Sequence, residues 1–430
     1  MTENATIPTA QKTIEDKPEQ KWSIDNVNVR CETKWWGYTL HLNEDATQLL
    51  EDIDTWAGTL LGALPGELKP VGKVIQMYLK LRNVIIKAED RGEGVKLVSP
   101  WIMPTLLAPL PDSQHIDDSQ LRWTSLVDDQ DGWSDEQKMA KVFSEDGPSL
   151  AGFQDKLFCV ARGGGNDQSL WWMSFDGSWS TYQQIPRPGG GAGPWSACAP
   201  ALAVFQNKLY CVHRGEGDDQ SLWWFTFDGN NWSLDQQIPR PGGGAGPWSA
   251  SGVGLAVFQN KLYCVHRGEG PDQSLWWFTF DGNNWSLDQQ IPRPGGGAGP
   301  WSAGAPALAV FQDQLYCVHR GADSDQSLWW FTFDGNNWSL DQQIPGVGSI
   351  YGPWSAAGPG LAVFQNKLYC VHRGEGPDQY LWWFSFDGSY WSQDTKNTAA
   401  TSAYQPGIAV YRHPDGTRDQ LLCMHRGVQS

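Results

Sequence analysis

The sequence is poor in positive charge and has no long apolar run. It contains 31 Lys and Arg against 48 Asp and Glu, so the formal net charge of its 430 residues is −17 at pH 7. Nucleic acids and anionic membranes would repel such a chain, and we expect neither as the main partner. No stretch approaches the roughly 18 consecutive apolar residues of a membrane-spanning helix, so no transmembrane segment is expected.

The start of the chain lacks the basic and apolar regions of a signal peptide. We therefore expect cytoplasmic synthesis, with release by a non-classical route left open. Residues 1–22 are polar and rich in Thr, Glu, Lys and Pro, which predicts a disordered tail.

The cysteines are too regularly placed for a disulfide framework. Six of the eight recur at one position of a repeated segment, where each would point into its own part of the fold. Buried free thiols are therefore expected at Cys159, Cys211, Cys264, Cys317, Cys370 and Cys423.

What the sequence does have is an internal repeat, in which a phenylalanine marks each copy. Phe153, Phe205, Phe258, Phe311 and Phe364 are separated by 52, 53, 53 and 53 residues. A copy holds four short apolar segments, ALAVFQN, KLYCVHRG, SLWWFTFDG and NWSLDQQI, divided by Gln-Asn, Gly-Glu-Gly and Asp-Gly turns. Four antiparallel strands in a repeat of this length are typical of a β-propeller blade.

The two ends of the repeat region complete each other. The last copy, Gly407–Ser430, has only the first two strand segments of a blade. The missing segments are Leu121–Leu126 and Asp131–Asp135, which align with LWWFTF and DGNNWSLD. Joining them closes the ring and leaves no unpaired edge. The sequence predicts an all-β six-bladed β-propeller over residues 119–430, with four-stranded blades and one blade shared between both ends.

A separate module precedes the propeller. Residues 26–42 alternate like a strand or hairpin, and a closing strand is expected after residue 94. Apolar residues recur at helical spacing in residues 47–64 and 70–87, which predicts two helices. We expect a small α+β domain over residues 23–112.

This module shows no recognisable chemistry. His41, Cys31, Glu44 and Asp45 match no zinc, Cys-His or paired-carboxylate spacing. The Gly-rich segment around Gly92 lacks the Lys and Ser/Thr of a phosphate loop. No metal, cofactor or catalytic residue is expected.

Polar residues recur in the propeller, between the second and third strand segments of four copies. Each hairpin begins with His-Arg-Gly, ends with Asp-Gln and is followed by a Leu-Trp-Trp segment. The candidate carbohydrate-binding residues are His213, Arg214, Asp219, Gln220, Trp223, His266, Arg267, Asp272, Gln273, Trp276, His319, Arg320, Asp325, Gln326, Trp329, His372, Arg373, Asp378, Gln379 and Trp382.

Two interpretations of these positions remain open. Arg and Asp could pair across each hairpin and hold its shape. Alternatively, the residues line equivalent pockets at one rim, where His, Arg and Asp bind sugar hydroxyls and Trp presents its face to the sugar. Neighbouring strand residues face opposite sides, so Trp223 and Trp224 cannot share a face. Because Leu222 shares a face with Trp224, the first Trp of each pair is the better pocket residue.

The Gly-rich linker IPRPGGGAGPWSA joins one blade to the next in three copies. Its Arg and Trp either complete an interblade pocket or, in the simpler interpretation, belong to a linker anchored by a packed Trp. These residues are Arg187 and Trp195, Arg240 and Trp248, and Arg293 and Trp301. The linkers after Ile344 and Asp394 depart from this pattern, so sites there are expected to differ or be lost.

The order Arg-Gly, Asp-x-x-Leu-Trp and Asp-Gly-x-x-Trp-Ser resembles the β-propeller lectins of the tectonin and Photorhabdus-lectin type. The resemblance covers residues 119–430. It implies binding of carbohydrates, often fucosylated or methylated, in repeated pockets around the ring. The Photorhabdus type has seven blades where this sequence predicts six, and the His of His-Arg-Gly has no counterpart in that pattern.

A second similarity concerns Thr279–Trp285 and Ser385–Trp391, which are similar to the Asp-box turns of the six-bladed sialidases. That similarity is to a structural turn. A sialidase needs three Arg, a Tyr nucleophile and an acid from different blades. Catalysis requires converging, non-equivalent groups, so nearly uniform repeats favour a binding protein over an enzyme.

We therefore expect a multivalent lectin, not an enzyme, whose partners are glycans or glycoconjugates of cell surfaces and whose weak single sites are strengthened by avidity. The N-terminal domain would then be an effector or assembly module, for example of a toxin or defence protein, and a homo-oligomer is left open. The alternatives are a protein-binding propeller scaffold and, less favoured, a sialidase-like glycosidase.

Overall fold

A computed structural model describes the strand backbones of the N-terminal part and most of the repeat region. The repeat region is described over residues 119–128, 132–188, 193–241, 246–293, 299–346, 352–413, 416 and 419–428. The chain divides into two units, Met1–His115 and Ile116–Ser430.

The first unit contains an antiparallel sheet whose five described strands follow one another in chain order. They are β1 (Gln20–Ile24), β2 (Val27–Lys34), β3 (Gly37–Leu42), β4 (Val95–Pro100) and β5 (Ala108–Pro111). The β2–β3 hairpin lies in residues 26–42, and β1 starts within the segment expected to be a disordered tail. The helices expected at residues 47–64 and 70–87 lie outside the described residues.

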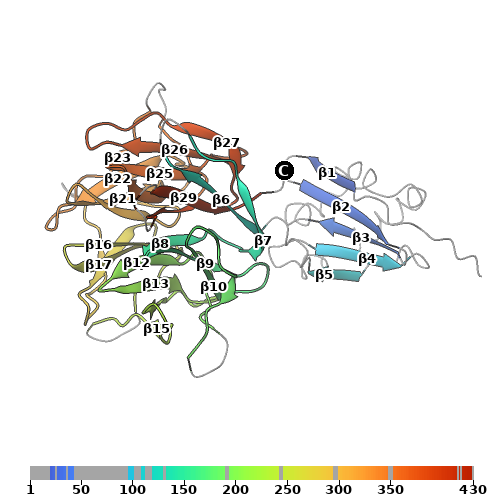
Figure 1. The fold of residues 1–430 in the computed structure, drawn as a ribbon, viewed down its shortest axis with the longest axis horizontal. Helices are drawn as coiled ribbons and strands as arrows, with labels where there is room; N and C mark the ends of the chain where they lie inside the picture. The colour runs from blue at the N-terminus through green and yellow to red at the C-terminus, as the bar shows by residue number, and fades with distance from the viewer. Residues whose placement is uncertain are drawn as a thin grey trace, which may run out of the picture. The chain divides into compact units, whose positions relative to one another are not determined.

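The second unit is a six-bladed β-propeller of four-stranded antiparallel sheets, as the sequence predicted (Figure 1). The first strand of each blade contacts the first strands of both neighbouring blades, so these strands surround the axis in a closed circle. From blade one to blade six they are β8 (Ser149–Phe153), β12 (Ala201–Phe205), β16 (Val253–Phe258), β20 (Ala307–Phe311), β24 (Gly360–Phe364) and β28 (Gly407–Tyr411).

The second and third strands form the middle of each blade. The second strands are β9 (Lys156–Arg162), β13 (Lys208–Arg214), β17 (Lys261–Arg267), β21 (Gln314–Arg320), β25 (Lys367–Arg373) and β29 (Gln420–Arg426). The third strands are β10 (Leu170–Phe175), β14 (Leu222–Phe227), β18 (Leu275–Phe280), β22 (Leu328–Phe333), β26 (Tyr380–Phe386) and β6 (Gln120–Leu126).

The fourth strands differ from the continuous segment that NWSLDQQI predicted. In blade three, Trp285 forms an isolated bridge with Phe280, and the Ser286 hydroxyl accepts a hydrogen bond from the Thr279 N–H at 2.8 Å. The chain therefore bulges before it rejoins the sheet. The fourth strands are β11 (Gln183–Gln184), β15 (Gln236–Gln237), β19 (Gln289–Gln290), β23 (Gln342–Gln343), β27 (Thr395–Thr401) and β7 (Gln137–Phe143).

Blade six closes the ring with strands from both ends of the repeat region. Its order is β28-β29-β6-β7, and β29 pairs with β6 from Leu421 opposite Leu126 to Arg426 opposite Leu121 (Figure 1). The predicted sharing of this blade is confirmed. The strands from the two ends of the repeat region thereby complete one four-stranded blade, and neither β29 nor β6 is left as an unpaired edge.

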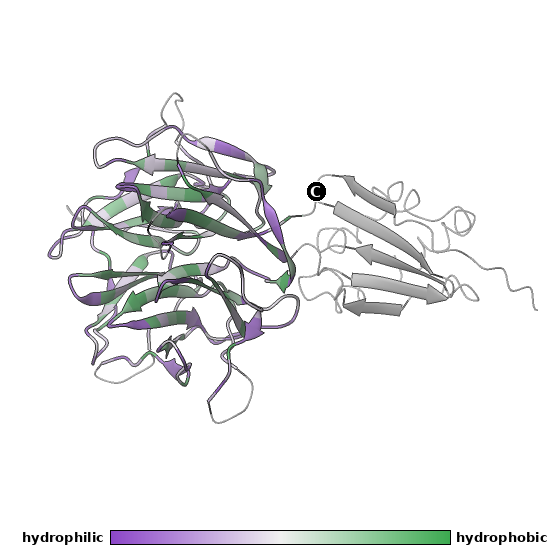
Figure 2. Ribbon diagram, viewed as in Figure 1, coloured by the Kyte–Doolittle hydropathy of each residue, from purple (hydrophilic) through white to green (hydrophobic). Residues whose placement is uncertain are grey.

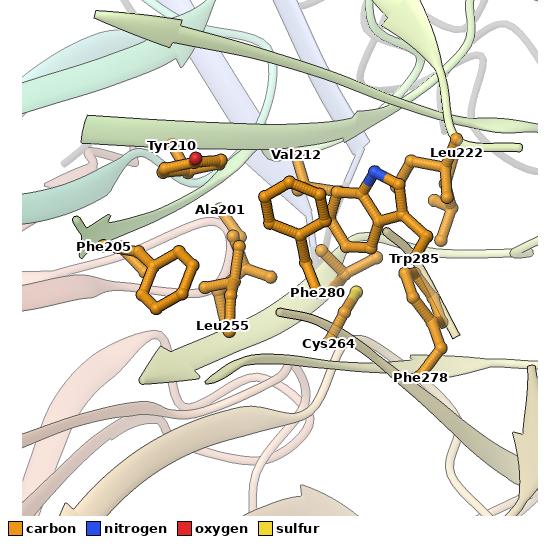
Figure 3. Close-up of a cluster of buried hydrophobic side chains, with 14 residues drawn as sticks. Ala201, Phe205, Tyr210, Val212, Leu222, Leu255, Cys264, Phe278, Phe280 and Trp285 are labelled. Carbon is orange, nitrogen blue, oxygen red and sulfur yellow. The ribbon is translucent and has the colours of Figure 1, made fainter. Parts of the chain in front are cut away.

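Hydrophobic side chains from two adjacent blades form each core. Figure 3 shows the cluster between blades two and three, where Tyr210 and Leu222 meet Leu255, Phe280 and Trp285. Strand residues alternate between the two faces of a blade, so every blade contributes to the core on each side. The six repeated cysteines lie in these cores as free, buried thiols, as expected. Figure 2 shows the corresponding concentration of hydrophobic residues in the strands and of hydrophilic residues in many loops.

Tight turns connect the first and second strands. In blade three, Gln259 and Asn260 both have positive φ, 45° and 58°, at the expected Gln-Asn turn. Two consecutive left-handed residues match the right-handed twist of a two-residue hairpin. This turn lies at one end of the blade, and the His-Arg-Gly hairpin lies at the other.

Candidate functional site

The Asp and the first Trp of each hairpin form a hydrogen-bonded pair. In blade three, the Trp276 indole N–H donates to the Asp272 carboxylate at 2.8 Å, and the Ser274 backbone N–H donates to its other oxygen at 2.9 Å. The same bond occurs between Trp223 and Asp219 at 2.8 Å, Trp329 and Asp325 at 2.7 Å, and Trp382 and Asp378 at 3.1 Å. Blade one has it as well, between Trp171 and Asp167 at 2.6 Å, in a hairpin that begins with Ala-Arg-Gly and so lay outside the His-Arg-Gly pattern.

The glycine of His-Arg-Gly makes room for this carboxylate. A Cβ atom on Gly268 would collide with the Asp272 side chain. Partial burial by itself would raise the pKa of Asp272, but the bonds from Ser274 and Trp276 outweigh it and hold the pKa below its ordinary value. The carboxylate is therefore an ionised acceptor at neutral pH.

The histidines are buried and are not available to a ligand. His266 is 1% exposed, with Nε2 at 3.0 Å from the Asp288 carboxylate and Nδ1 at 3.1 Å from the Arg267 carbonyl oxygen. The prediction that they contact sugar is wrong for all of them, because their ring nitrogens are used within the blade. The other pairs are His213 with Asp235, His319 with Asp341, and His372 with Asp394.

The repeats themselves contained the signal for this pairing. Blade one has Ala161 at the His position and Tyr182 at the Asp position, so both partners change together. Blade six keeps the pair as His425 and Glu136, with Nε2 3.3 Å from a carboxylate oxygen. Residues that vary together in one chain indicate a structural contact.

The arginines make no direct hydrogen bond to the hairpin aspartates, although the charges of Arg214 and Arg267 contribute to the lowered pKa values of Asp219 and Asp272. Among the described residues, no ion pair joins them. Instead the guanidinium groups bond to backbone carbonyl oxygens: Arg214 to Gly217 at 3.3 Å, Arg267 to Gly270 at 3.5 Å, Arg320 to Ser355 at 2.8 Å, and Arg373 to Ser402 at 2.9 Å. They stabilise their own turn or the adjoining linker.

The glutamines lie where neighbouring hairpins meet. The Gln273 amide donates to Asp323 of the next blade at 2.7 Å, and Gln168 accepts from the Gly217 N–H at 3.2 Å. Gln220 and Gln326 each accept, through the backbone oxygen, a bond from the Ser N–H of the following Gly-Pro-Trp-Ser linker, and Gln379 accepts one from the Ser402 N–H. These residues therefore connect blades at the hairpin end of the ring.

Strand alternation separates the two adjacent tryptophans. Trp277 packs against the core between blades three and four, with its ring stacked 5.9 Å from that of Tyr263. Trp276 lies outside that core and is half-buried. The same division holds for Trp223 and Trp224.

A cavity of about 500 Å³ brings one Trp–Asp pair together with a linker. It lies between blades four and five, where Trp382 and Asp378 face Pro345, Gly346 and Trp354, with Glu375 and Asp394 also on the wall. The sequence analysis did not predict Trp354 and Glu375 as site residues. The irregular linker after Ile344 did indicate that a site there would differ or be lost. The structure has a cavity at this linker.

The linker tryptophans of the other blades are exposed to solvent. Trp195, Trp248 and Trp301 are 38%, 40% and 50% exposed. The simpler interpretation, in which the linker is anchored by a packed Trp, is therefore wrong for them. The backbone of each forms a bridge to the Ser that directly precedes the third strand of the preceding blade.

The Asp-Gly turns lie at the opposite end of the blades and are structural. The Asp281 carboxylate accepts bonds from the backbone N–H groups of Asn283 and Asn284 at 2.8 and 2.7 Å. Those bonds hold its pKa below the ordinary value. Within the described residues there is no cluster of three or more His, Cys, Asp and Glu suited to a metal ion, and no helix that could span a membrane.

No family model and no curated protein matches the sequence. Similar solved structures include a lectin from Aleuria aurantia, described as a six-bladed β-propeller with a novel fucose recognition mode, at 12% identity over 72% of this chain and 92% of that one, with a TM-score of 0.46. AofleA from Arthrobotrys oligospora matches at 13% identity over 64% and 77%, with a TM-score of 0.44. Trypanosoma rangeli sialidase matches at 12% identity over 67% and 56%, with a TM-score of 0.42. The resemblance to tectonin and Photorhabdus lectins stays a prediction.

Proposed function

We propose that this protein binds carbohydrates through repeated sites at the hairpin end of the propeller. The observation that carries the proposal is the Trp–Asp pair, which recurs in five blades and forms part of the wall of a cavity in one of them. A sugar ring offers an apolar C–H face and several hydroxyl groups. An indole face and a fixed carboxylate match those two features.

The ionised Asp suits an acceptor of hydroxyl hydrogens. A general acid would need a raised pKa, whereas the pKa values of Asp219 and Asp272 are lowered despite partial burial. The pairs are also equivalent from blade to blade, and hydrolysis requires unlike groups at one point. This chemistry favours binding over catalysis.

Several equivalent sites on one rigid ring would act together on a glycan-coated surface. Single sites of this openness are expected to be weak, and simultaneous engagement raises the apparent affinity. The N-terminal unit would then be an effector or assembly module, a hypothesis that rests on the two-part layout. It fails if deletion of that unit changes neither the oligomeric state nor toxicity to a target cell.

The test is a glycan array with the full chain and the variant Trp223→Ala/Trp276→Ala/Trp329→Ala. We expect signal on a coherent class of sugars and its loss in the variant. Asn230→Ala/Asn283→Ala/Asn336→Ala changes exposed residues at the opposite end of the same blades and should keep the signal. A blank array from folded protein would favour a protein-binding scaffold, and hydrolysis of a sialoside would favour the glycosidase alternative.

A further inference from the structure

The cavity between blades four and five differs from the corresponding interblade positions in its linker. After Ile-Pro, the first three linkers carry exposed arginines, Arg187, Arg240 and Arg293, whereas this linker has Gly346. The next five residues, Val-Gly-Ser-Ile-Tyr, add no basic side chain. The described residues that line the cavity include no Lys or Arg.

A second difference lies in the residue that follows Trp-Ser. Gln393 lines the cavity at the position that Leu234, Leu287 and Leu340 occupy in blades two to four. Those leucines are 49%, 50% and 50% exposed. This cavity therefore has one polar side chain where the other blades present an apolar one.

Three carboxylates line the cavity, and their partners differ. Asp394 is bound by His372 at 3.2 Å, and Asp378 is bound by Trp382 at 3.1 Å and by Lys396 at 3.2 Å. The described structure gives the Glu375 side chain neither a hydrogen bond nor an ion pair. One carboxylate is thus available to a ligand.

The aromatic residues of this blade already hold a cation of the chain itself. The Lys396 ammonium lies 4.0 Å from the Tyr380 ring centroid and 5.5 Å from that of Trp382. Lys396 is not among the cavity-lining residues, and its charge is balanced by Asp378. Trp382 and Trp354 line the cavity itself, and indole faces attract cations.

We infer that this one cavity selects a protonated amino sugar, while the Arg-bearing positions of blades two to four do not. Glu375 pairs with the ligand ammonium, and the sugar ring packs against an indole. The arginine of the other linkers, which would repel the ammonium, is absent here. The inference rests on the proposed carbohydrate binding and names the ligand class of one site.

The test is calorimetry of the full chain with a β-1,4-linked glucosamine trimer and with its N-acetylated counterpart. The amine trimer should bind about five- to tenfold more tightly, the combined effect of one partly exposed ion pair and one cation–π contact. Glu375→Gln and Gly346→Arg should each remove that preference. Gly346→Ala, the control for the added side chain without its charge, should keep it.

A reciprocal change sharpens the test. Arg240→Gly gives the linker before blade three the character of the Gly346 linker, while Glu269, Asp272 and Asp288 already stand at the corresponding acidic positions. In calorimetry, the Arg240→Gly variant should bind the amine trimer at two sites instead of one. Equal binding of the two trimers, or a preference that survives Gly346→Arg, would overturn the inference. If glycans still bind on the array, only the amine selectivity has failed; if nothing binds, the proposed function has failed with it.

Discussion

The two adjacent tryptophans of each third strand have different surroundings. Substituting each one separately should therefore change stability by different amounts. Trp277 stacks on Tyr263 and meets Trp338 edge-on at 5.5 Å inside an interblade core. Trp277→Ala should cost about 3–5 kcal/mol of unfolding free energy, because it leaves a large cavity. Trp276→Ala loses mainly one hydrogen bond, about 1 kcal/mol. Urea unfolding of the two variants measures the difference, and equal losses would contradict the assignment of Trp276 to the rim.

His425 in blade six is expected to make the fold sensitive to acid. Complete burial, and then the charge of Arg122, lower its pKa from 6.5 to about 3. Below pH 6.5 the unfolded chain binds a proton that the folded chain excludes, so this stability is full above pH 6.5 and is lost as the pH falls towards 3. The loss should reach about 3 kcal/mol at pH 4.

The measurement is urea unfolding of the wild type and of His425→Gln at pH 7 and pH 4. The variant should lose less stability between the two pH values, because it lacks this titration. If both proteins lose the same amount, another group causes the acid sensitivity.

The partners of the histidines could not be predicted from the hairpin pattern. The pattern placed His266 beside Arg267 and Asp272 in one hairpin, which suggested a common pocket. Its actual partner, Asp288, follows 22 residues later and reaches it through the fourth segment of the blade. Spacing within a hairpin cannot reveal a partner on another strand, whereas the joint change to Ala161 and Tyr182 could have done so.

At the scale of elements, blade six contains a buried ion pair next to the strands contributed by the end of the repeat region. Arg122 of β6 lies 2.8 Å from Glu136, with side chains 8% and 11% exposed, and the other oxygen of Glu136 accepts from the Thr401 N–H of blade five at 3.3 Å. Glu136→Gln leaves a buried guanidinium without its counter-charge and should cost about 3–5 kcal/mol.

An exposed pair provides the control. Lys156 and Asp176 lie 3.2 Å apart with side chains about half exposed, 47% and 52%. Asp176→Asn should change stability by less than about 1 kcal/mol. Thermal unfolding followed by circular dichroism compares the two, and a Glu136→Gln melting temperature equal to that of the control would refute the stabilising role of this pair.

Strand number and order could be predicted from the repeat, but the length of the outer strand could not. NWSLDQQI has the alternation of a full strand, yet only Gln289–Gln290 pair in blade three. The reason is local: Trp285 turns inward to bury its ring, 5% exposed, and Ser286 bonds back to Thr279. A pattern of apolar residues does not distinguish a strand from a bulge that buries the same side chain.

For the whole molecule, the proposed function predicts that the number of sites sets the apparent affinity for a glycan-coated surface. The intrinsic affinity of each site for a single sugar should not depend on that number. Trp223→Ala, Trp276→Ala and Trp329→Ala introduced one after another should each weaken binding to a dense glycan surface about tenfold, because each removes one simultaneous contact. Binding of a free monovalent sugar should lose capacity while its affinity stays constant. Surface plasmon resonance at high and low glycan density separates these quantities, and the same loss at both densities would contradict multivalency.

The ring as a whole was predictable because its repeats are nearly identical, and the cavity was not because it depends on where they differ. Gly346 and Gln393 occupy positions that carry Arg and Leu in blades two to four. A departure from a repeat shows that a site has changed, but the space and partners of Glu375 and Trp354 depend on the packing of two blades.

The shared blade also has a consequence for how the protein is made. Arg122 bonds to the carbonyl oxygen of Val428, 306 residues later, so the partners of β6 leave the ribosome long after β6 itself. Five blades can form during translation while the circle is still open. Completion of the ring thus waits for β29, and a stop codon between β6 and β29 yields a propeller that cannot close.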